Sequence, residues 1–271
     1  FIQLMHTGRI GHPLNLPAGA RVLGPSAIAA AGEIYTDQEG MKPHPTPEPM
    51  TDADIKTAIA EFGTAARNAV AAGADGVELH AANGYLLEQF IRPTSNQRTD
   101  SYGGSIENRA RFVLEAAKAA IAAIGADKVG IRLSPYGTFN DMPDYPEMAS
   151  DYAYLAAKLN ELGLVYVHLV DHSPMGAPEV PASIKQTIRK AFKRSLILLG
   201  GYDAARAEKH GWALRIEARP VGGDQNVGAE HFGFVGAEFA QARRAGFFTG
   251  FDEHRNVVAQ AALARRCDST A

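Results

Sequence analysis

The stretch GVELHAANGYLLEQF, residues 76–90, decides the fold, because a buried strand, a polar turn and a second apolar run follow one another in it. Its first part, Gly76–His80, is short and mostly aliphatic, which is typical of a strand covered on both faces in a parallel sheet. The strand ends at His80, and Asn83 and Tyr85 follow within the next turn. Ligands of α/β folds bind at the carboxyl ends of strands, so these polar residues predict a ligand site.

Four further apolar runs on either side of this stretch have the same character. They are predicted as strands of the same sheet: Phe1–Met5, Val129–Leu133, Val165–Val170 and Leu196–Leu199. Helical patterns lie between them, and are predicted from an N-cap at Thr51 to Gly73, from Ser105 to Gly125, from about Pro146 to Leu162 and from about Glu179 to Phe192. The repetition of strand and helix predicts right-handed βαβ units on a parallel sheet, in an open α/β sheet or a barrel.

One connection is much longer than the others. About 45 residues separate the first strand from the Thr51 helix, whereas βα loops usually have 2–6 residues. The segment contains four prolines, at positions 43, 45, 47 and 49, and a predicted hairpin around Asp37–Gly40. Long loops on the strand-exit side usually shape a binding site, and the alternative is a plain linker.

Composition excludes several classes of protein. The chain of 271 residues carries 27 basic and 30 acidic side chains, a formal charge of −3, and 46% of its residues are hydrophobic. A disordered protein is excluded by the apolar content, and binding to nucleic acid is disfavoured by the lack of basic excess. The longest small apolar run, 116–126, is mostly alanine and contains Lys118, so no membrane association is expected.

The cysteine content and the start of the chain give two more expectations. The single cysteine, Cys267, cannot form an internal disulfide, which fits a reducing compartment, and we expect a cytoplasmic protein. The chain begins at Phe1, inside an apolar run and without Met, so we expect that an N-terminal part is missing.

Polar or glycine residues stand at the exits of all five predicted strands. Besides those of the central stretch, they are Gln3, Arg132, His168, Asp171-His172 and Gly200-Gly201. Their convergence favours a ligand pocket, although Arg132 could instead belong to a buried ion pair and His80 could be structural. No set of His, Asp and Glu has metal-ligand spacing, and we expect no metal site.

The residues after the central strand resemble a known family. The run HAANGYLL, residues 80–87, is specific, and so are the residues that follow it: Phe90, Pro93, Ser95-Asn96, Arg98–Asp100 and Tyr102–Ser105. The flanking segments also fit, namely QLMHTGR at 3–9, GPSAI at 24–28, ENRAR at 107–111 and IRLSP at 131–135. Over about residues 1–208 the chain resembles the old yellow enzyme family of FMN-dependent ene reductases.

The resemblance implies a fold and an activity. It implies a TIM (β/α)8 barrel with FMN at the carboxyl ends of the strands. NADPH or NADH would reduce the flavin, which would then pass hydride to the activated C=C of a small electrophilic alkene, an α,β-unsaturated carbonyl or nitro compound. Because strands three to seven are recognisable and the first two are not, we expect an incomplete barrel. Residues 1–208 would be its FMN-binding portion, and 209–271 a divergent segment with candidate strands at Leu214–Ala218 and Phe232–Val235.

The resemblance also implies roles for the catalytic residues. His80 and Asn83 would bind the carbonyl or nitro oxygen, where two donors stabilise the charge that builds as hydride arrives. Tyr85 would protonate the α-carbon. His80 would also contact the cofactor.

The remaining roles concern the flavin. Arg132 would lie beside its N1–C2=O edge, and Gln3 would be a partner of its pyrimidine ring. The backbone at Gly200 and Gly201 would approach the phosphate or the ribityl chain.

Two alternatives remain open. The chain could be a truncated or damaged relic of the same fold that binds flavin weakly or not at all. It could also be a TIM-like lyase or aldolase, although such an enzyme needs a strand-end lysine or a metal set, and the strand ends offer neither.

Overall fold

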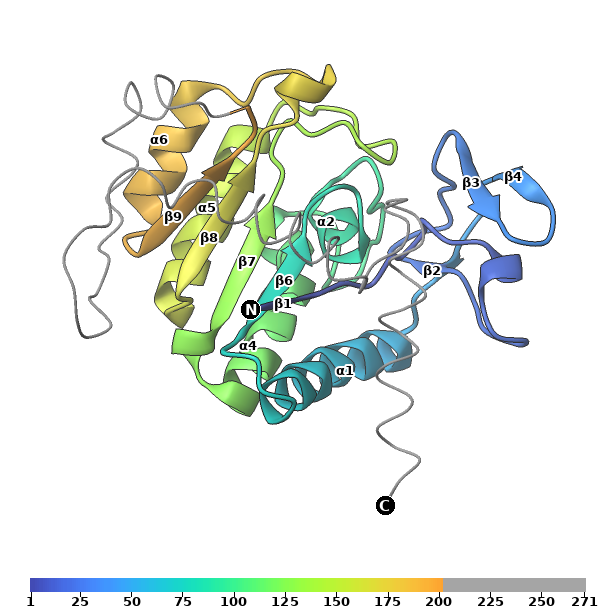
Figure 1. The fold of residues 1–271 in the computed structure, drawn as a ribbon. Helices are drawn as coiled ribbons and strands as arrows, with labels where there is room; N and C mark the ends of the chain where they lie inside the picture. The colour runs from blue at the N-terminus through green and yellow to red at the C-terminus, as the bar shows by residue number, and fades with distance from the viewer. Residues whose placement is uncertain (202–271) are drawn as a thin grey trace, which may run out of the picture. The chain divides into compact units, whose positions relative to one another are not determined.

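The computed structural model describes residues 1–201, and the divergent segment 209–271 with its two candidate strands lies outside the described residues. The core is a five-stranded parallel sheet in the order β1-β6-β7-β8-β9 (Figure 1). Its strands are β1 (Ile2–Leu4), β6 (Val77–Ala81), β7 (Val129–Leu133), β8 (Tyr166–Val170) and β9 (Ser195–Leu199). All five predicted strands are confirmed, and each pairs with the next in chain order, as successive βαβ units require.

Six α-helices connect the strands. They are α1 (Asp52–Ala71), α2 (Leu86–Ile91), α3 (Ile106–Arg109), α4 (Arg111–Ile124), α5 (Met148–Leu162) and α6 (Ala182–Ala191) within residues 1–201. Short 3-10 turns are η1 (Pro13–Asn15), η2 (Ala126–Lys128) and η3 (Ser173–Met175). The short helix α2 was not predicted, and it begins directly after the polar turn that follows β6.

Two predicted helices differ from the structure. The single helix predicted from Ser105 to Gly125 is wrong, because the chain divides at Ala110 into α3 and α4. The division follows Arg109, a buried side chain that donates to the carbonyl oxygen of Ile91 and pairs with Asp151, so that α3 is held against α2 and α5.

The helix predicted from Glu179 is also wrong at its start, because α6 begins only after Pro181. A residue that precedes proline is disfavoured in helical conformation, and Val180 occupies that position.

The N-terminus of α1 confirms the predicted cap at Thr51. The Thr51 hydroxyl accepts from the backbone N–H of Asp54 at 3.2 Å, and the Asp54 carboxylate accepts from the backbone N–H of Thr51 at 2.8 Å. This reciprocal pair is a capping box, which satisfies two N–H groups that the first turn leaves without helical partners. The box fixes where the long connection ends and α1 begins.

The two faces of the sheet have different chemistry. Side chains alternate between faces along a strand, so Val77, Leu79 and Ala81 of β6 lie on one face while Glu78 and His80 lie on the other. The first set belongs to the hydrophobic core, together with the alternate residues of β7 and β8 and buried residues of α1, α4, α5 and α6. The helices therefore cover one face, and polar side chains collect on the opposite one.

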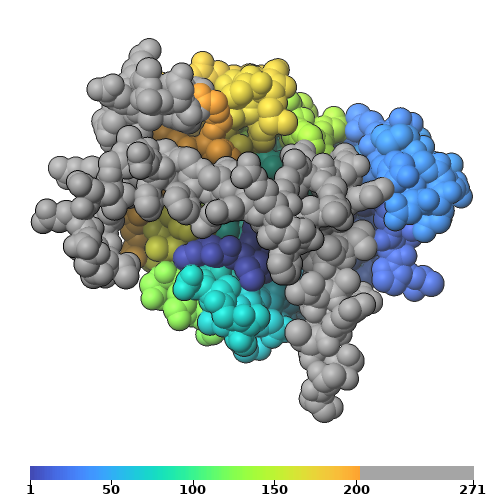
Figure 2. All heavy atoms as spheres, in the orientation of Figure 1, coloured from blue at the N-terminus to red at the C-terminus, as the bar shows by residue number. Residues whose placement is uncertain are grey.

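The long connection after β1 forms two small sheets. Strands β3 (Glu33–Thr36) and β4 (Gly40–Pro43) pair antiparallel, which confirms the predicted hairpin. Strands β2 (Leu23–Gly24) and β5 (Glu48–Pro49) form a short parallel pair. The hairpin is a projecting lobe in Figure 2. Within the described part of the chain, no helix combines the length and the apolar character needed to span a membrane.

We predict that Thr51→Ala lowers the free energy of unfolding by about 1 kcal/mol, because it removes one half of the capping box. Urea denaturation followed by circular dichroism measures this. The control is Thr64→Ala, which changes an exposed threonine inside α1 and should leave stability unchanged or slightly raised. Equal effects of the two changes would contradict the assigned cap.

Candidate functional site

The polar face of the sheet is organised in rows set by strand register. His80 of β6 pairs with Arg132 of β7, and Arg132 pairs with His168 of β8. One row nearer the start of the strands, Gln3 of β1 pairs with Glu78 of β6. Because residues in register on neighbouring strands share a face, these five side chains form one surface, which we call the polar face.

Glu78 connects the strands of the polar face. Its carboxylate accepts from the Gln3 side-chain nitrogen at 2.7 Å and contacts His168 Nδ1 at 3.0 Å, and it also hydrogen-bonds Tyr166. Burial by itself raises the pKa of Glu78, but the hydrogen bonds and charge of its partners outweigh burial and lower the pKa. A charged carboxylate therefore lies among the polar residues at neutral pH. The sequence pattern indicated no role for Glu78, although Glu78 lies two residues before His80 in β6 and therefore on the same face of the sheet.

His80 is held as a neutral ring with a defined proton position. Its Nδ1 accepts from the backbone N–H of Ala82 at 3.3 Å, which leaves Nε2 as the atom that carries the proton. Burial, followed by the charge of Arg132, lowers the pKa of His80 to about 3. His80 at neutral pH is therefore a hydrogen-bond donor through Nε2 without a positive charge.

Tyr85 lies against His80. The two rings meet edge to face, with centroids 5.0 Å apart and planes at 79°. Tyr85 is buried in a small cluster with Ile10 and Ala30, against which Met5 packs. The structure thus brings two of the three predicted catalytic side chains into contact.

Asn83 occupies an unusual backbone conformation in the turn between β6 and α2. Its φ is +58°, in the left-handed region that asparagine tolerates better than most residues. The Ser134 hydroxyl accepts from its backbone N–H at 2.8 Å, and its carbonyl oxygen accepts from Asn140 at 2.7 Å. The side-chain oxygen of Asn83 is buried and has no hydrogen-bond partner among residues 1–201. Ser134 and Asn140 therefore fix the backbone of Asn83 through contacts that do not involve its side chain.

Glu88 supports this turn from beneath. It is completely buried, accepts from the backbone N–H of Gly84 at 2.8 Å, and accepts from the Ser134 hydroxyl at 2.9 Å. Arg92 and Tyr152 complete the network, each at 2.8 Å from Glu88 Oε1. Neither Glu88 nor Ser134 was given a role from the sequence. The only signal available was a glutamate inside an otherwise apolar run, which must find donors if it is buried.

The ends of β8 and β9 come very close together at Gly200. Its φ is +128°, and a Cβ there would lie 1.9 Å from the carbonyl oxygen of Asp171. Gly201 follows with a φ of +59°. Only glycine fits at position 200, so the backbone after β9 can turn next to β8. This glycine pair follows the end of β9, and the predicted ligand roles of the two glycines and of the polar face stay predictions.

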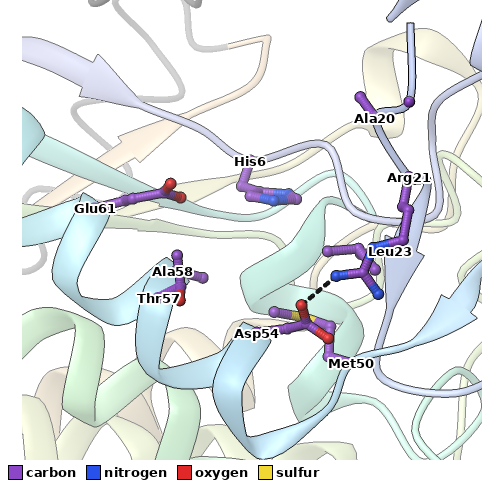
Figure 3. A pocket seen from close by; sticks show the side chains of 10 residues that line it. His6, Ala20, Arg21, Leu23, Met50, Asp54, Thr57, Ala58 and Glu61 are labelled. Carbon is purple, nitrogen blue, oxygen red and sulfur yellow. Dashed lines mark hydrogen bonds and ion pairs between the residues drawn. The ribbon is translucent and has the colours of Figure 1, made fainter. Parts of the chain in front are cut away.

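A separate hollow of about 270 Å³ lies between the segment after β1 and the first turns of α1. His6 points into it, and the ion pair of Arg21 with Asp54 borders it (Figure 3). Burial lowers the pKa of His6 to about 4. None of His80, Asn83 and Tyr85 lines this hollow, so its chemistry is distinct from that of the polar face. Within residues 1–201, His, Cys, Asp and Glu form no group of three with metal-binding geometry.

Comparison with known proteins shows to which family the chain is similar. Residues 1–212 match the NADH:flavin oxidoreductase / NADH oxidase family. The chain is 42% identical over 212 residues to a chanoclavine-I aldehyde reductase of Penicillium roqueforti, covering 76% of this chain and 54% of the relative. It is 44% identical over 164 residues to a probable flavin mononucleotide-dependent alkene reductase of Leishmania infantum, covering 59% of this chain and 45% of the relative.

A solved structure agrees with these relatives. Morphinone reductase superposes with a TM-score of 0.72 at 38% identity, over 77% of this chain and 57% of that protein. The chain therefore spans about half the length of the proteins it matches.

We predict that Ser134→Ala lowers the free energy of unfolding by about 1–3 kcal/mol, because the N–H of Asn83 loses its acceptor in a site that water reaches poorly. Urea denaturation measures the loss. The control, Ser150→Ala, removes an exposed hydroxyl that contacts only the Glu147 carbonyl oxygen, and should cost less than about 0.5 kcal/mol. A Ser134→Ala protein as stable as the control would contradict the network.

We predict that His80 makes stability depend on pH below neutrality. The unfolded chain binds a proton at His80 as pH falls through about 6.5, whereas the folded chain resists protonation until about 3. Folding therefore loses up to about 1.4 kcal/mol per pH unit between these values, and the contribution is fully present above the unfolded pKa. Unfolding free energies at pH 7 and pH 5 should differ more in the wild-type chain than in His80→Gln. The same pH dependence in both would show that His80 is not buried as a neutral ring.

Proposed function

Because the chain belongs to the NADH:flavin oxidoreductase / NADH oxidase family, we propose that it is the flavin-binding part of an ene reductase. In this proposal it binds FMN on the polar face and reduces the activated C=C of α,β-unsaturated carbonyl or nitro compounds with NADPH or NADH. The single observation that supports it best is the row of His80, Arg132 and His168, with Tyr85 against His80, on the face of the sheet opposite the hydrophobic core.

The residues of the polar face fit a flavin. Arg132 supplies a permanent positive charge. This charge suits the N1–C2=O edge of the flavin, which becomes anionic when the flavin is reduced. Gln3 supplies an amide from the neighbouring strand β1. The Asn83 side-chain oxygen forms no hydrogen bond within residues 1–201, and its carboxamide and the Nε2–H of His80 would interact with a bound molecule. FMN, when bound, would supply the hydride.

His80 and Asn83 would hold the oxygen of the substrate. His80 Nε2–H and the Asn83 carboxamide N–H would both donate to a carbonyl or nitro oxygen, and this interaction strengthens as negative charge builds there. The low pKa of His80 supports a neutral donor, which stabilises the charge without giving up its own proton. The turn held by Ser134 and Glu88 would keep Asn83 in place, so that little reorganisation is needed during the reaction.

Tyr85 would deliver a proton to the α-carbon. A phenol is protonated at neutral pH and can act as a general acid when it lies next to the reacting carbon. Its burial beside His80 supports this role, because a side chain held in one orientation can serve one face of the substrate.

Gly200 and Gly201 would let the backbone approach the phosphate or ribityl chain of FMN. Their positive φ values, and the Asp171 carbonyl oxygen that leaves no room for a Cβ at position 200, favour glycine here, and a glycine backbone can come close to a ligand. In the same proposal residues 1–208 form the FMN-binding portion and 209–271 a separate segment.

A second candidate is a non-catalytic relic with weak or no flavin binding. The observation that favours it is that the family match ends at residue 212 and does not include residues 213–271. Flavin absorbance after incubation of the purified chain with FMN and desalting discriminates the two, because a colourless chain favours the relic.

We predict that the chain retains FMN and reduces cyclohexenone with NADPH or NADH. We further predict that Tyr85→Phe slows the step in which substrate reoxidises the flavin by about 10²-fold, because the general acid is lost. Stopped-flow absorbance measures this step separately from reduction of the flavin by NAD(P)H, which should be unchanged.

The control for this experiment is Tyr35→Phe, which alters a tyrosine of the hairpin that is 39% exposed and should leave both steps unchanged. If Tyr85→Phe reoxidises as fast as wild type, Tyr85 is not the proton donor.

A further inference from the structure

Glu78 lies on the polar face but has no role in the proposed function. It is a charged carboxylate, only 9% exposed, in the middle of β6. Three donors from two other strands surround it: the Gln3 side-chain nitrogen, His168 Nδ1 and the Tyr166 hydroxyl. Burial of a carboxylate is costly unless donors satisfy it, and here they come from both neighbouring sides of β6.

The contact between Tyr166 and Glu78 requires a glycine at position 130. Tyr166 reaches Glu78 because Gly130 separates them in the register, and a Cβ at Gly130 would lie 2.2 Å from the Tyr166 ring. The tyrosine ring therefore crosses β7 over the glycine. Glu78 is thus a built acceptor site for three side chains rather than a charge that happens to be covered.

The contact with Gln3 fixes the direction of its amide. The two ends of a glutamine amide are a carbonyl acceptor and an N–H donor of nearly the same shape, so either end can face a given neighbour. An ionised carboxylate only accepts, which forces the nitrogen of Gln3 toward Glu78, at 2.7 Å. The carbonyl oxygen of Gln3 then faces away from Glu78, and it accepts from no group within residues 1–201.

We propose that Glu78 is a positioning residue that holds the Gln3 amide with its carbonyl oxygen toward the ligand, so that position 3 accepts from a ring N–H and does not donate to a ring carbonyl. The inference rests on the proposed function. The pyrimidine ring of a flavin carries one imide N–H between two carbonyl groups, and the Gln3 oxygen would select that N–H. Arg132, which can only donate, would serve a carbonyl oxygen instead.

The orientation of Gln3 is tested first without flavin. In ¹H–¹⁵N spectra of the chain, the side-chain NH₂ of Gln3, identified by its loss in Gln3→Met, should show one proton shifted downfield and protected from exchange by the carboxylate. Glu78→Gln should abolish both properties, because the new amide can donate to the Gln3 carbonyl oxygen and allows the Gln3 amide group to rotate by about 180°. The control is Asp151→Asn, which removes a buried carboxylate paired with Arg109 and should leave the Gln3 signals unchanged. Identical Gln3 signals in wild type and Glu78→Gln would overturn the proposal.

The consequence for the ligand is tested with a double-mutant cycle on FMN affinity, measured by quenching of flavin fluorescence. Glu78→Gln and Gln3→Met should each weaken binding by about tenfold, the effect of one hydrogen bond in a protected site. Because Glu78 acts through Gln3, the double variant should also be weakened about tenfold. A double variant weakened about a hundredfold would show independent effects and would overturn the positioning role.

The two measurements separate the possible failures. If the wild-type chain binds no FMN, the proposed function fails, and the flavin selectivity fails with it. The amide spectra still decide whether Glu78 orients Gln3. If FMN binds but the Gln3 signals are the same in wild type and in Glu78→Gln, the proposed function stands and the positioning role is overturned.

Discussion

The two-residue period of β6 is the constraint on which the rest of the structure depends. It sends Val77, Leu79 and Ala81 into the core beneath the helices and Glu78 and His80 onto the opposite face. A shift of one residue in register would bury the charged carboxylate among aliphatic side chains and expose the core residues, so the register is strongly determined. The polar face therefore follows from the same pattern that folds the sheet.

The turn after β6 adds a second constraint. The positive φ of Asn83 is maintained by Ser134 on one side and Asn140 on the other, while Glu88 holds both Ser134 and the N–H of Gly84. This conformation leaves the Asn83 side-chain oxygen without a hydrogen-bond partner among the described residues, and Tyr85 lies beside His80. Strain in a turn persists only when the surrounding structure determines it, and a buried network of this kind does so.

Much of the fold could be predicted from the sequence, because its signals are local. The aliphatic runs gave the five strands, Thr51 marked the start of α1, and the segment around Asp37–Gly40 marked the hairpin. What could not be predicted depends on residues far apart in the chain. Glu78 forms a hydrogen bond with Gln3, 75 positions away in the sequence, and Ser134 forms one with Glu88, 46 positions away. No local sequence pattern indicates either hydrogen bond. The division at Ala110 depends likewise on Arg109 reaching Asp151. The catalytic and flavin-binding roles of His80, Asn83, Tyr85, Arg132, Gln3, Gly200 and Gly201 stay predictions.

We propose that this chain binds FMN on the polar face and not in the hollow beside α1. Diffraction from crystals of the chain grown with FMN tests it most directly. We expect density for the flavin ring against Gln3, Arg132 and His80, with the ring N–H facing the Gln3 oxygen. Density for the ring between His6 and the first turns of α1, or a polar face that stays free of flavin in crystals that contain it, would show that FMN does not bind on the polar face.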